Sequence, residues 1–223
     1  MLLNQFANKY VRNKSATGGN IVYQEDIYFG YRWYETADTM HFFDNLPNGY
    51  DSAVIYPFGY GLSYTTFTKE IVSSSAFGDD VSVEVKVTNT GSKEGKEVVQ
   101  LYYSAPYTKG GIEKSSTVLG DFAKTKTLKS GESETLKLTI KKEEMASYDY
   151  KNEKAYVLDK GEYVYQIKEN SHEISKDSSG KNLEFKSNEE KKVFKNGKSS
   201  DKTAVTNQFD DVSAIFKDTE QKG

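Results

Sequence analysis

Strict alternation of apolar and polar residues marks the middle of the chain. In "VSVEVKVTN" (residues 81–89) a valine occupies every second position up to residue 87, and Ser, Glu and Lys lie between them. A period of two residues is typical of a strand with one face buried and the other in water. "ETLKLTI" (residues 134–140) repeats the alternation with Leu136, Leu138 and Ile140. The pattern predicts two strands that face one hydrophobic core.

Further strand-like runs follow at short intervals, separated by turn residues. They are "KEVVQLYYSA" (residues 96–105), the beginning of "STVLGDFAKTKTLKSGES" (residues 116–133), and two runs flanking a turn at Lys160–Gly161 in "KAYVLDKGEYVYQI" (residues 154–167). Turn signals about every 8–12 residues favour an antiparallel β-sandwich of about seven strands. We therefore predict a mainly β, immunoglobulin-like sandwich over residues 68–168.

Four tyrosines lie on these predicted strands. In the pairs Tyr102–Tyr103 and Tyr163–Tyr165 we expect one ring in the core and the other at the surface or an interface.

The two flanks lack this alternation. Ile27, Tyr31 and Tyr34 have helical spacing, which predicts a short helix from about Asp26 to Thr36 in an otherwise irregular N-terminal segment. "YPFGYGLSYTTF" (residues 56–67) combines rings with glycines, as a junction pressed against a large body would.

Residues 169–223 are rich in Lys, Glu, Ser and Asn, which predicts a polar linker or extension. Near its end, Phe209, Val212 and Phe216 recur at helical spacing and would suit docking on a partner surface.

Composition and charge exclude several classes of function. The net charge is −3, with 30 basic and 33 acidic residues. The overall charge therefore gives no electrostatic attraction to nucleic acid or to an anionic membrane. The absence of cysteine removes disulfides and thiolate sites, and with the lack of a signal-peptide-like start it favours a cytoplasmic location. No run is long enough to span a membrane, so we expect a soluble protein.

Candidate chemistry is sparse. Carboxylates occur as adjacent pairs, but neighbours on a strand point to opposite faces and do not flank one bond. His41 and His172 are far apart, with His172 in the polar tail, and no metal-ligand spacing or Ser-His-Asp arrangement is present. We expect no metal, no cofactor and no catalytic residue.

Two aromatic stretches point to a known family. "YQEDIYFGYRWYET" (residues 23–36) followed by "YPFGYGLSYTTF" resembles the end of the α/β-sandwich domain of glycoside hydrolase family 3, the β-glucosidase family. Three later stretches resemble successive strands of that family's fibronectin type III-like domain: "VTNTGSKEGKEVVQLYYSAP" (87–106), "LGDFAKTKTLKSGESETLKLTI" (119–140) and "KGEYVYQI" (160–167). The likeness covers roughly residues 20–168.

The resemblance implies three parts. Residues 1–67 would be a remnant of the α/β-sandwich domain plus a hinge, residues 68–168 the fibronectin type III-like sandwich, and residues 169–223 a linker or tail. Members of the family are retaining glycosidases, which need two carboxylates about 5–5.5 Å apart. The nucleophile lies on a barrel of about 250 residues in a Ser-Asp-Trp context that this chain lacks. No catalytic residue is carried over, and the chain alone is expected to be inactive.

The order of the missing domains stays open. Some family members place the barrel after the fibronectin-like domain and a linker, and that linker often carries an "FDD" segment like the one in residues 207–212. This favours the inverted order. The stretch before residue 20 matches the family poorly, so we also expect truncation at that end.

The aromatic residues are the candidate contacts. We expect the rings of the N-terminal segment and hinge to form a domain interface: Tyr31, Tyr34, Tyr56, Phe58, Tyr60, Tyr64 and Phe67. Weaker candidates for contact with substrate are Trp33, whose ring could also simply pack in the interface, and Tyr107 and Lys109 in a long loop.

The predicted function is an accessory, structural portion of a family 3 β-glucosidase-type hydrolase that packs against the catalytic domains of the same polypeptide. The alternative is a freestanding sandwich that binds carbohydrate, such as β-glucosides or oligosaccharides, or protein. Exposed hinge rings would be its contact face, or a contact between two copies. A gene product without a selected function is the third alternative.

Overall fold

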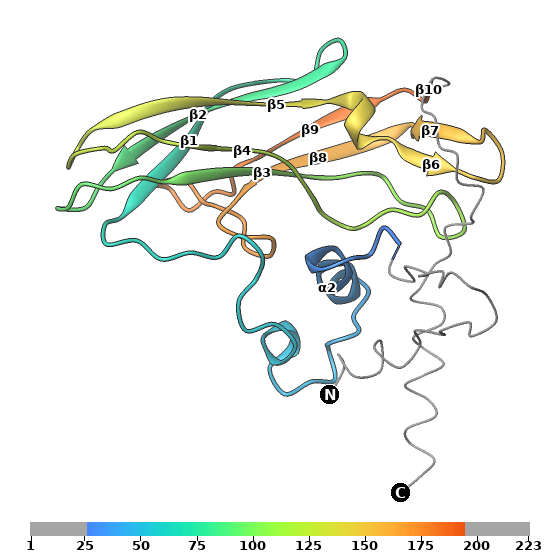
Figure 1. Cartoon of the computed structure of the whole chain (residues 1–223), viewed down its shortest axis with the longest axis horizontal. Coiled ribbons are helices and arrows are strands. Elements are labelled where there is room, and N and C mark those ends of the chain that lie inside the picture. The colour runs from blue at the N-terminus through green and yellow to red at the C-terminus, as the bar shows by residue number, and fades with distance from the viewer. Residues whose placement is uncertain (1–25, 195–223) are drawn as a thin grey trace, which may run out of the picture.

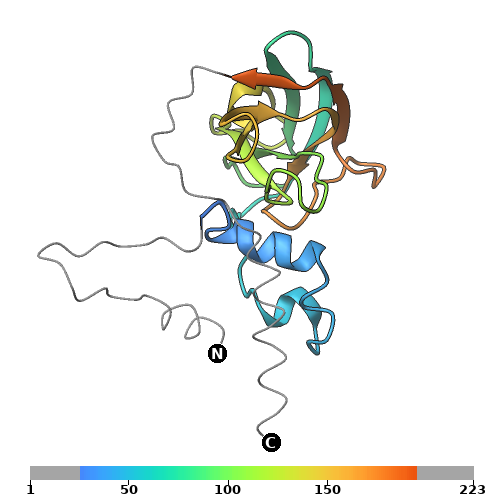
Figure 2. The same ribbon diagram turned by 90° about the vertical axis from the view of Figure 1, so that its right-hand side faces the viewer.

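The computed structural model describes residues 26–194. A β-sandwich makes up most of it, and a smaller N-terminal segment lies against one face (Figures 1 and 2). That segment contains helix α2 (Tyr31–Thr39) and the 3-10 helix η1 (Gly49–Ser52). The helical spacing of Phe209, Val212 and Phe216, and the parts of the first and third predicted domains before residue 26 and after residue 194, lie outside the described residues.

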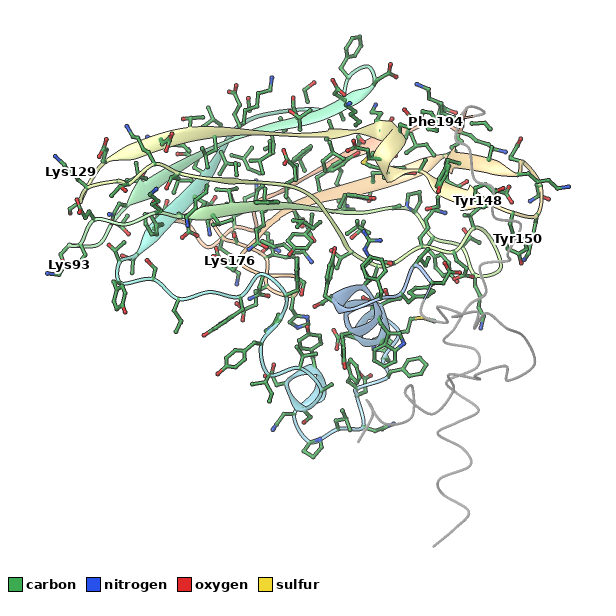
Figure 3. All side chains as sticks on the ribbon, in the orientation of Figure 1. Lys93, Lys129, Tyr148, Tyr150, Lys176 and Phe194 are labelled. Carbon is green, nitrogen blue, oxygen red and sulfur yellow. The ribbon has the colours of Figure 1, made fainter. Side chains whose placement is uncertain are left out.

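Two antiparallel sheets form the sandwich. The first has the order β1-β2-β5 and the second β4-β3-β8-β9. A small third sheet, β10-β7-β6, lies at the end of the sandwich that Tyr148 and Tyr150 mark in Figure 3, opposite Lys93 and Lys129. The elements are β1 (Phe67–Ser75), β2 (Asp80–Asn89), β3 (Val98–Ser104), β4 (Val118–Lys124), β5 (Ser133–Lys141), the 3-10 helix η2 (Lys142–Met145), β6 (Ser147–Asp149), β7 (Ala155–Leu158), β8 (Gly161–Lys168), β9 (Glu184–Glu189) and β10 (Lys192–Phe194).

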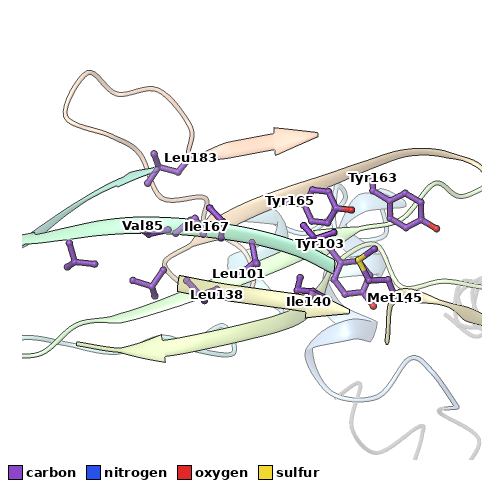
Figure 4. Packing of buried hydrophobic residues seen from close by; sticks show 14 of the residues in the cluster. Val85, Leu101, Tyr103, Leu138, Ile140, Met145, Tyr163, Tyr165, Ile167 and Leu183 are labelled. Atoms are coloured by element: carbon purple, nitrogen blue, oxygen red, sulfur yellow. The ribbon is translucent and has the colours of Figure 1, made fainter. Parts of the chain in front are cut away.

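The core lies between the two sheets, as the alternation predicted. The four valines of β2 are at most 1% exposed, and Leu138 and Ile140 of β5 are equally buried. Leu101 and Ile167 face them from the second sheet, with Tyr165 nearby (Figure 4). The predicted mainly β sandwich is confirmed.

The sheet continues beyond the predicted end of the sandwich. Strand β9 pairs with β8 from Gly161↔Glu189 to Gln166↔Glu184, so residues 169–194 are not only a polar extension. Their polarity misled the prediction because β9 is an edge strand, and every second side chain over residues 184–188 is exposed. The runs flanking Lys160–Gly161 are strands, but β7 and β8 belong to different sheets, because β7 pairs with β6 and β10.

The strand tyrosines depart from the expected alternation. Tyr102 and Tyr103 are both buried, and so are Tyr163 and Tyr165. Strand β3 is covered on both faces, since Tyr103 points into the core and Tyr102 packs edge-on against Tyr31 of α2, with ring centroids 6.2 Å apart. Tyr163 and Tyr165 are two positions apart on one strand and therefore share the core face.

Helix α2 begins later than predicted. Gly30, its N-cap, has φ of 56°, and Asp26 also has a positive φ, so residues 26–30 form a turn and not a first helical turn. The helix then extends to Thr39 and buries Trp33 and Ala37 in a second hydrophobic cluster with Tyr28, Phe43 and Tyr50.

Candidate functional site

The stretch between η1 and β1 is the most exposed apolar surface of the described chain. We call residues 55–64 the docking segment. Its large apolar side chains stand in solvent, with exposed fractions from 46% to 100%: Ile55, Tyr56, Phe58, Tyr60, Leu62 and Tyr64. Tyr56 and Tyr60 lie beside each other, with ring centroids 5.2 Å apart. So much apolar area on so short a stretch is typical of an interaction surface.

The backbone of the docking segment is nevertheless held in place. The Phe58 carbonyl accepts a hydrogen bond of 2.7 Å from the Ser171 amide, and the Gly59 carbonyl accepts one from the Gln100 side chain. The Phe58 ring stacks on Tyr31 of α2 at 4.6 Å. Gly59 has φ of 84°, and a Cβ there would meet the Gln100 amide oxygen at 2.2 Å, so both conformation and space require glycine. The rings are displayed on an ordered support.

A buried asparagine fixes the far end of this segment. Asn89, fully buried at the end of β2, donates to the carbonyls of Lys93 and Leu128. Its side-chain oxygen accepts from the Thr65 hydroxyl and the Gly91 amide. All the polar atoms of this amide are therefore paired, and the start of β1 is tied to two loops. The sequence placed residue 89 at the end of a strand-like run and gave no sign of these contacts.

A groove of about 580 Å³ lies between the docking segment and the sandwich. Its apolar lining includes Phe58, Tyr60 and Phe122. Lys69, also part of the lining and only 5% exposed, forms ion pairs of 2.7 Å with both Glu97 and Glu169. Burial would raise the pKa of the Glu169 carboxyl, but Lys69 and Ser175 outweigh it and lower that pKa. The groove thus combines ring surface with a buried lysine that is paired with two carboxylates.

A second polar cluster joins the N-terminal segment to the sandwich. Glu35 of α2 is 5% exposed, and its carboxylate accepts hydrogen bonds from Tyr50 (2.6 Å), Ser171 (2.7 Å) and His172 (3.0 Å). The His172 ring also stacks on Tyr50, with centroids 3.7 Å apart. We call these four residues the Glu35 cluster. His172, expected in a polar tail, is therefore a contact residue, and nothing in the local sequence indicated its distant partner.

The pKa values in this cluster follow from its contacts. Burial alone would raise the pKa of Glu35, but the hydrogen bonds from His172, Tyr50 and Ser171 outweigh it, and the pKa is lowered. The hydrogen bond to Glu35 raises the pKa of His172 against the effect of burial. The geometry and these shifts favour an ionised pair.

The candidate substrate contacts do not come together. Trp33 is 6% exposed and packs edge-on against Tyr34 and Phe43 inside the N-terminal segment, so its ring is not open as a sugar platform would be. Tyr107 lines a cleft of about 440 Å³ beside α2 and contacts Glu113, whereas Lys109 is exposed and does not line that cleft.

The predicted interface residues fall into two groups. Tyr31, Tyr34 and Phe67 are half-buried and pack within the described chain, Phe67 against the sandwich core and Tyr34 against the second cluster. Tyr56, Phe58, Tyr60 and Tyr64 are the exposed group in the docking segment. Their predicted contact with a further domain stays a prediction.

No group of three or more His, Asp or Glu side chains in residues 26–194 could hold a metal ion. No helix in the same range is long and apolar enough to cross a membrane.

Known proteins similar to this chain share this architecture. Residues 97–171 match the family described as "Fibronectin type III-like domain". β-Glucosidase A of Butyrivibrio fibrisolvens is 44% identical over 161 residues, which cover 64% of this chain and 18% of that protein. The solved β-glucosidase 3B of Thermotoga neapolitana, in complex with α-D-glucose, is 37% identical with a TM-score of 0.61, over 78% of this chain and 21% of that one.

A third similar protein is the GH3 β-glucosidase of Bifidobacterium adolescentis, 26% identical with a TM-score of 0.63, over 86% of this chain and 24% of its own. The chain spans about a fifth of the length of the relatives it matches.

Proposed function

We propose that this chain is a non-catalytic, structural portion of a glycoside hydrolase family 3 β-glucosidase, because residues 97–171 match a fibronectin type III-like domain and the similar proteins are β-glucosidases. In this proposal the sandwich packs against catalytic domains of the same polypeptide through the docking segment. The reaction itself, retaining hydrolysis of a β-glucoside, would be carried out by carboxylates outside the described residues.

The observation that carries the proposal is the docking segment. Six large apolar side chains face solvent over ten residues while the backbone beneath them is hydrogen-bonded to the sandwich. A mobile loop would not need such hydrogen bonds to the sandwich, and a surface that stays in water would rarely expose so many aromatic rings together. Each such side chain contributes about 1.5–3 kcal/mol when a partner buries it, so the segment suffices for a stable domain contact.

Domain replacement tests the proposal. The matching region of Butyrivibrio fibrisolvens β-glucosidase A is exchanged for that of this chain, and hydrolysis of an aryl β-glucoside and thermal stability are measured. We expect an active hybrid whose melting temperature falls with Tyr64→Ser, because the ring is buried in the hybrid. Phe77→Ser is the matched control, since Phe77 is 91% exposed on a sandwich turn away from the docking segment and Tyr64 is 100% exposed.

Two results would contradict the proposal. Equal changes in melting temperature for the two substitutions in the hybrid would mean that the docking segment contacts no catalytic domain. Saturable binding of cello-oligosaccharides to the isolated chain, measured by calorimetry and lost in Tyr64→Ser, would favour the freestanding binding module instead.

A further inference from the structure

The N-terminal segment is attached to the sandwich by several contacts, of which one contains a histidine. Tyr28 donates to Glu113 at 2.6 Å, and the Tyr31 hydroxyl accepts from the Leu119 amide at 2.9 Å. Tyr28 keeps its charge state near neutral pH, because burial raises the pKa of its hydroxyl above the ordinary value. The contact between Glu35 and His172 is different, since an imidazole changes charge in the physiological range.

We infer that the ion pair between Glu35 of α2 and His172 of the sandwich is a pH-sensitive lock that holds the N-terminal segment in place. Three features of the geometry support it. The two side chains lie 137 positions apart in sequence, and their contact measures 3.0 Å. Glu35 is almost completely buried, and His172 keeps a third of its side chain exposed, so protons reach it from solvent. Tyr50 stacks on the His172 imidazole and donates a hydrogen bond to the Glu35 carboxylate, so it holds both partners in position.

The charges around His172 act in both directions. Asp38 of α2 favours the protonated imidazole, as Glu35 does, while Lys168 of β8 opposes it. Lys168 is itself buried, which lowers its pKa, and it donates to Thr117 and to the Ser171 carbonyl. Burial raises the pKa of Asp38, so its ionised form weakens the docked state somewhat.

The sign of the pH dependence follows from the two partners. The pKa of His172 is raised in the folded state, so its contribution is complete below the ordinary value of 6.5 and is lost as the pH rises through the raised pKa. The pKa of Glu35 is lowered, so its contribution is present above the ordinary value of 4.5 and is lost as the pH falls through the lowered pKa. The lock is therefore closed between the lowered pKa of Glu35 and the raised pKa of His172; it opens above the second value and also at acid pH below the first.

Opening the lock is expected to loosen the segment and not the sandwich. The second hydrophobic cluster holds only five buried residues, too few for a stable core of its own once the sandwich no longer supports it. The docking segment follows this cluster directly, and its Phe58 carbonyl is bound by Ser171, the neighbour of His172. Loosening the cluster would therefore also release the support of the docking segment.

The full chain provides its own reporter for the test. Trp33 is the sole tryptophan, and it lies buried on α2, so its emission follows the segment and not the sandwich. Thermal transitions are recorded by Trp33 emission at a series of values from about pH 5 to 9, the range in which a histidine with a raised pKa titrates. We expect the transition temperature to fall as the pH rises past 6.5.

Three substitutions decide the assignment. His172→Gln and Glu35→Gln should each remove the pH dependence, while His41→Gln should leave it unchanged, because His41 is 78% exposed and pairs with Asp44 inside the segment. In parallel, NMR of the two imidazoles gives the pKa of His172 directly, and it should return toward its ordinary value in Glu35→Gln. A pH dependence that survives in His172→Gln, or a His172 pKa that Glu35→Gln leaves unchanged, overturns the inference.

This experiment uses the chain alone, without any catalytic domain. Its failure would leave the proposed docking intact, and a failure of the domain replacement would leave the lock intact.

Discussion

The sandwich and the N-terminal segment differ in where their large apolar side chains are exposed. In the sandwich the exposed ones are scattered, such as Val72, Phe77 and Tyr156, and the core between the sheets is closed. In the N-terminal segment a small buried cluster is followed at once by six exposed apolar residues in a row of ten. The first region accounts for its own stability, and the second depends on neighbours.

This difference separates a region whose apolar residues are mostly buried from one that leaves them exposed. The sandwich buries most of its large apolar residues between its two sheets, as an independent domain does. In the docking segment, by contrast, backbone carbonyls are hydrogen-bonded to the sandwich while the large apolar side chains are exposed to water. The matched region makes up only 18% and 21% of two similar β-glucosidases, so those proteins contain enough further polypeptide to cover such a surface.

The largest effect is expected in the closed core. Leu138→Ala removes a side chain that is 0% exposed between the sheets, and the cavity left behind should lower the free energy of unfolding by about 3–5 kcal/mol. Denaturant unfolding followed by circular dichroism measures it. Leu136→Ala is the control, because Leu136 lies on the same face of β5 but is only half-buried.

A loss of similar size in both leucine variants would contradict the view that the core is centred between β2, β5 and the second sheet. It would indicate that Leu136 is buried as deeply as Leu138.

A smaller effect is expected where the two regions meet. Asn89→Ala leaves the carbonyls of Lys93 and Leu128 and the hydroxyl of Thr65 without their amide partner, at a cost of about 2 kcal/mol. The same unfolding measurement tests it, with Asn45→Ala as the control, since Asn45 is exposed in the N-terminal segment. An equal, small loss in both variants would mean that this hydrogen-bond network adds little to stability.

Sequence patterns predicted the sandwich well because its determinants are local. The alternation in residues 81–89 and 134–140 needs only a period of two to reveal a buried face, and the structure buries the valines and leucines accordingly. Strand β9 was missed because an edge strand can be almost entirely polar and still pair. Strand β9 forms because it pairs with β8, and no pattern within its own sequence predicts this pairing.

The candidate site was predicted only in part. The aromatic residues at 56–64 can be identified in the sequence, and the structure shows that they are exposed, but the partner that would cover them stays a prediction. The Glu35 cluster was not predictable, because it joins α2 to a loop 136 positions away in a stretch that composition alone assigns to a tail. A lone glutamate and a lone histidine carry no spacing signal, and only the fold brings them together.

The smallest effect on this chain is expected in the docking segment, and it sharpens the comparison most. Tyr64 is 100% exposed, so Tyr64→Ser should change the free energy of unfolding of the isolated chain by less than about 0.5 kcal/mol. The same change should lower the binding of a hydrophobic dye, because the ring is part of the exposed apolar surface. A loss of stability well above that limit would show that Tyr64 packs against the chain itself. The segment would then be a finished part of this fold, and the contrast between a closed sandwich and an open docking surface would fail.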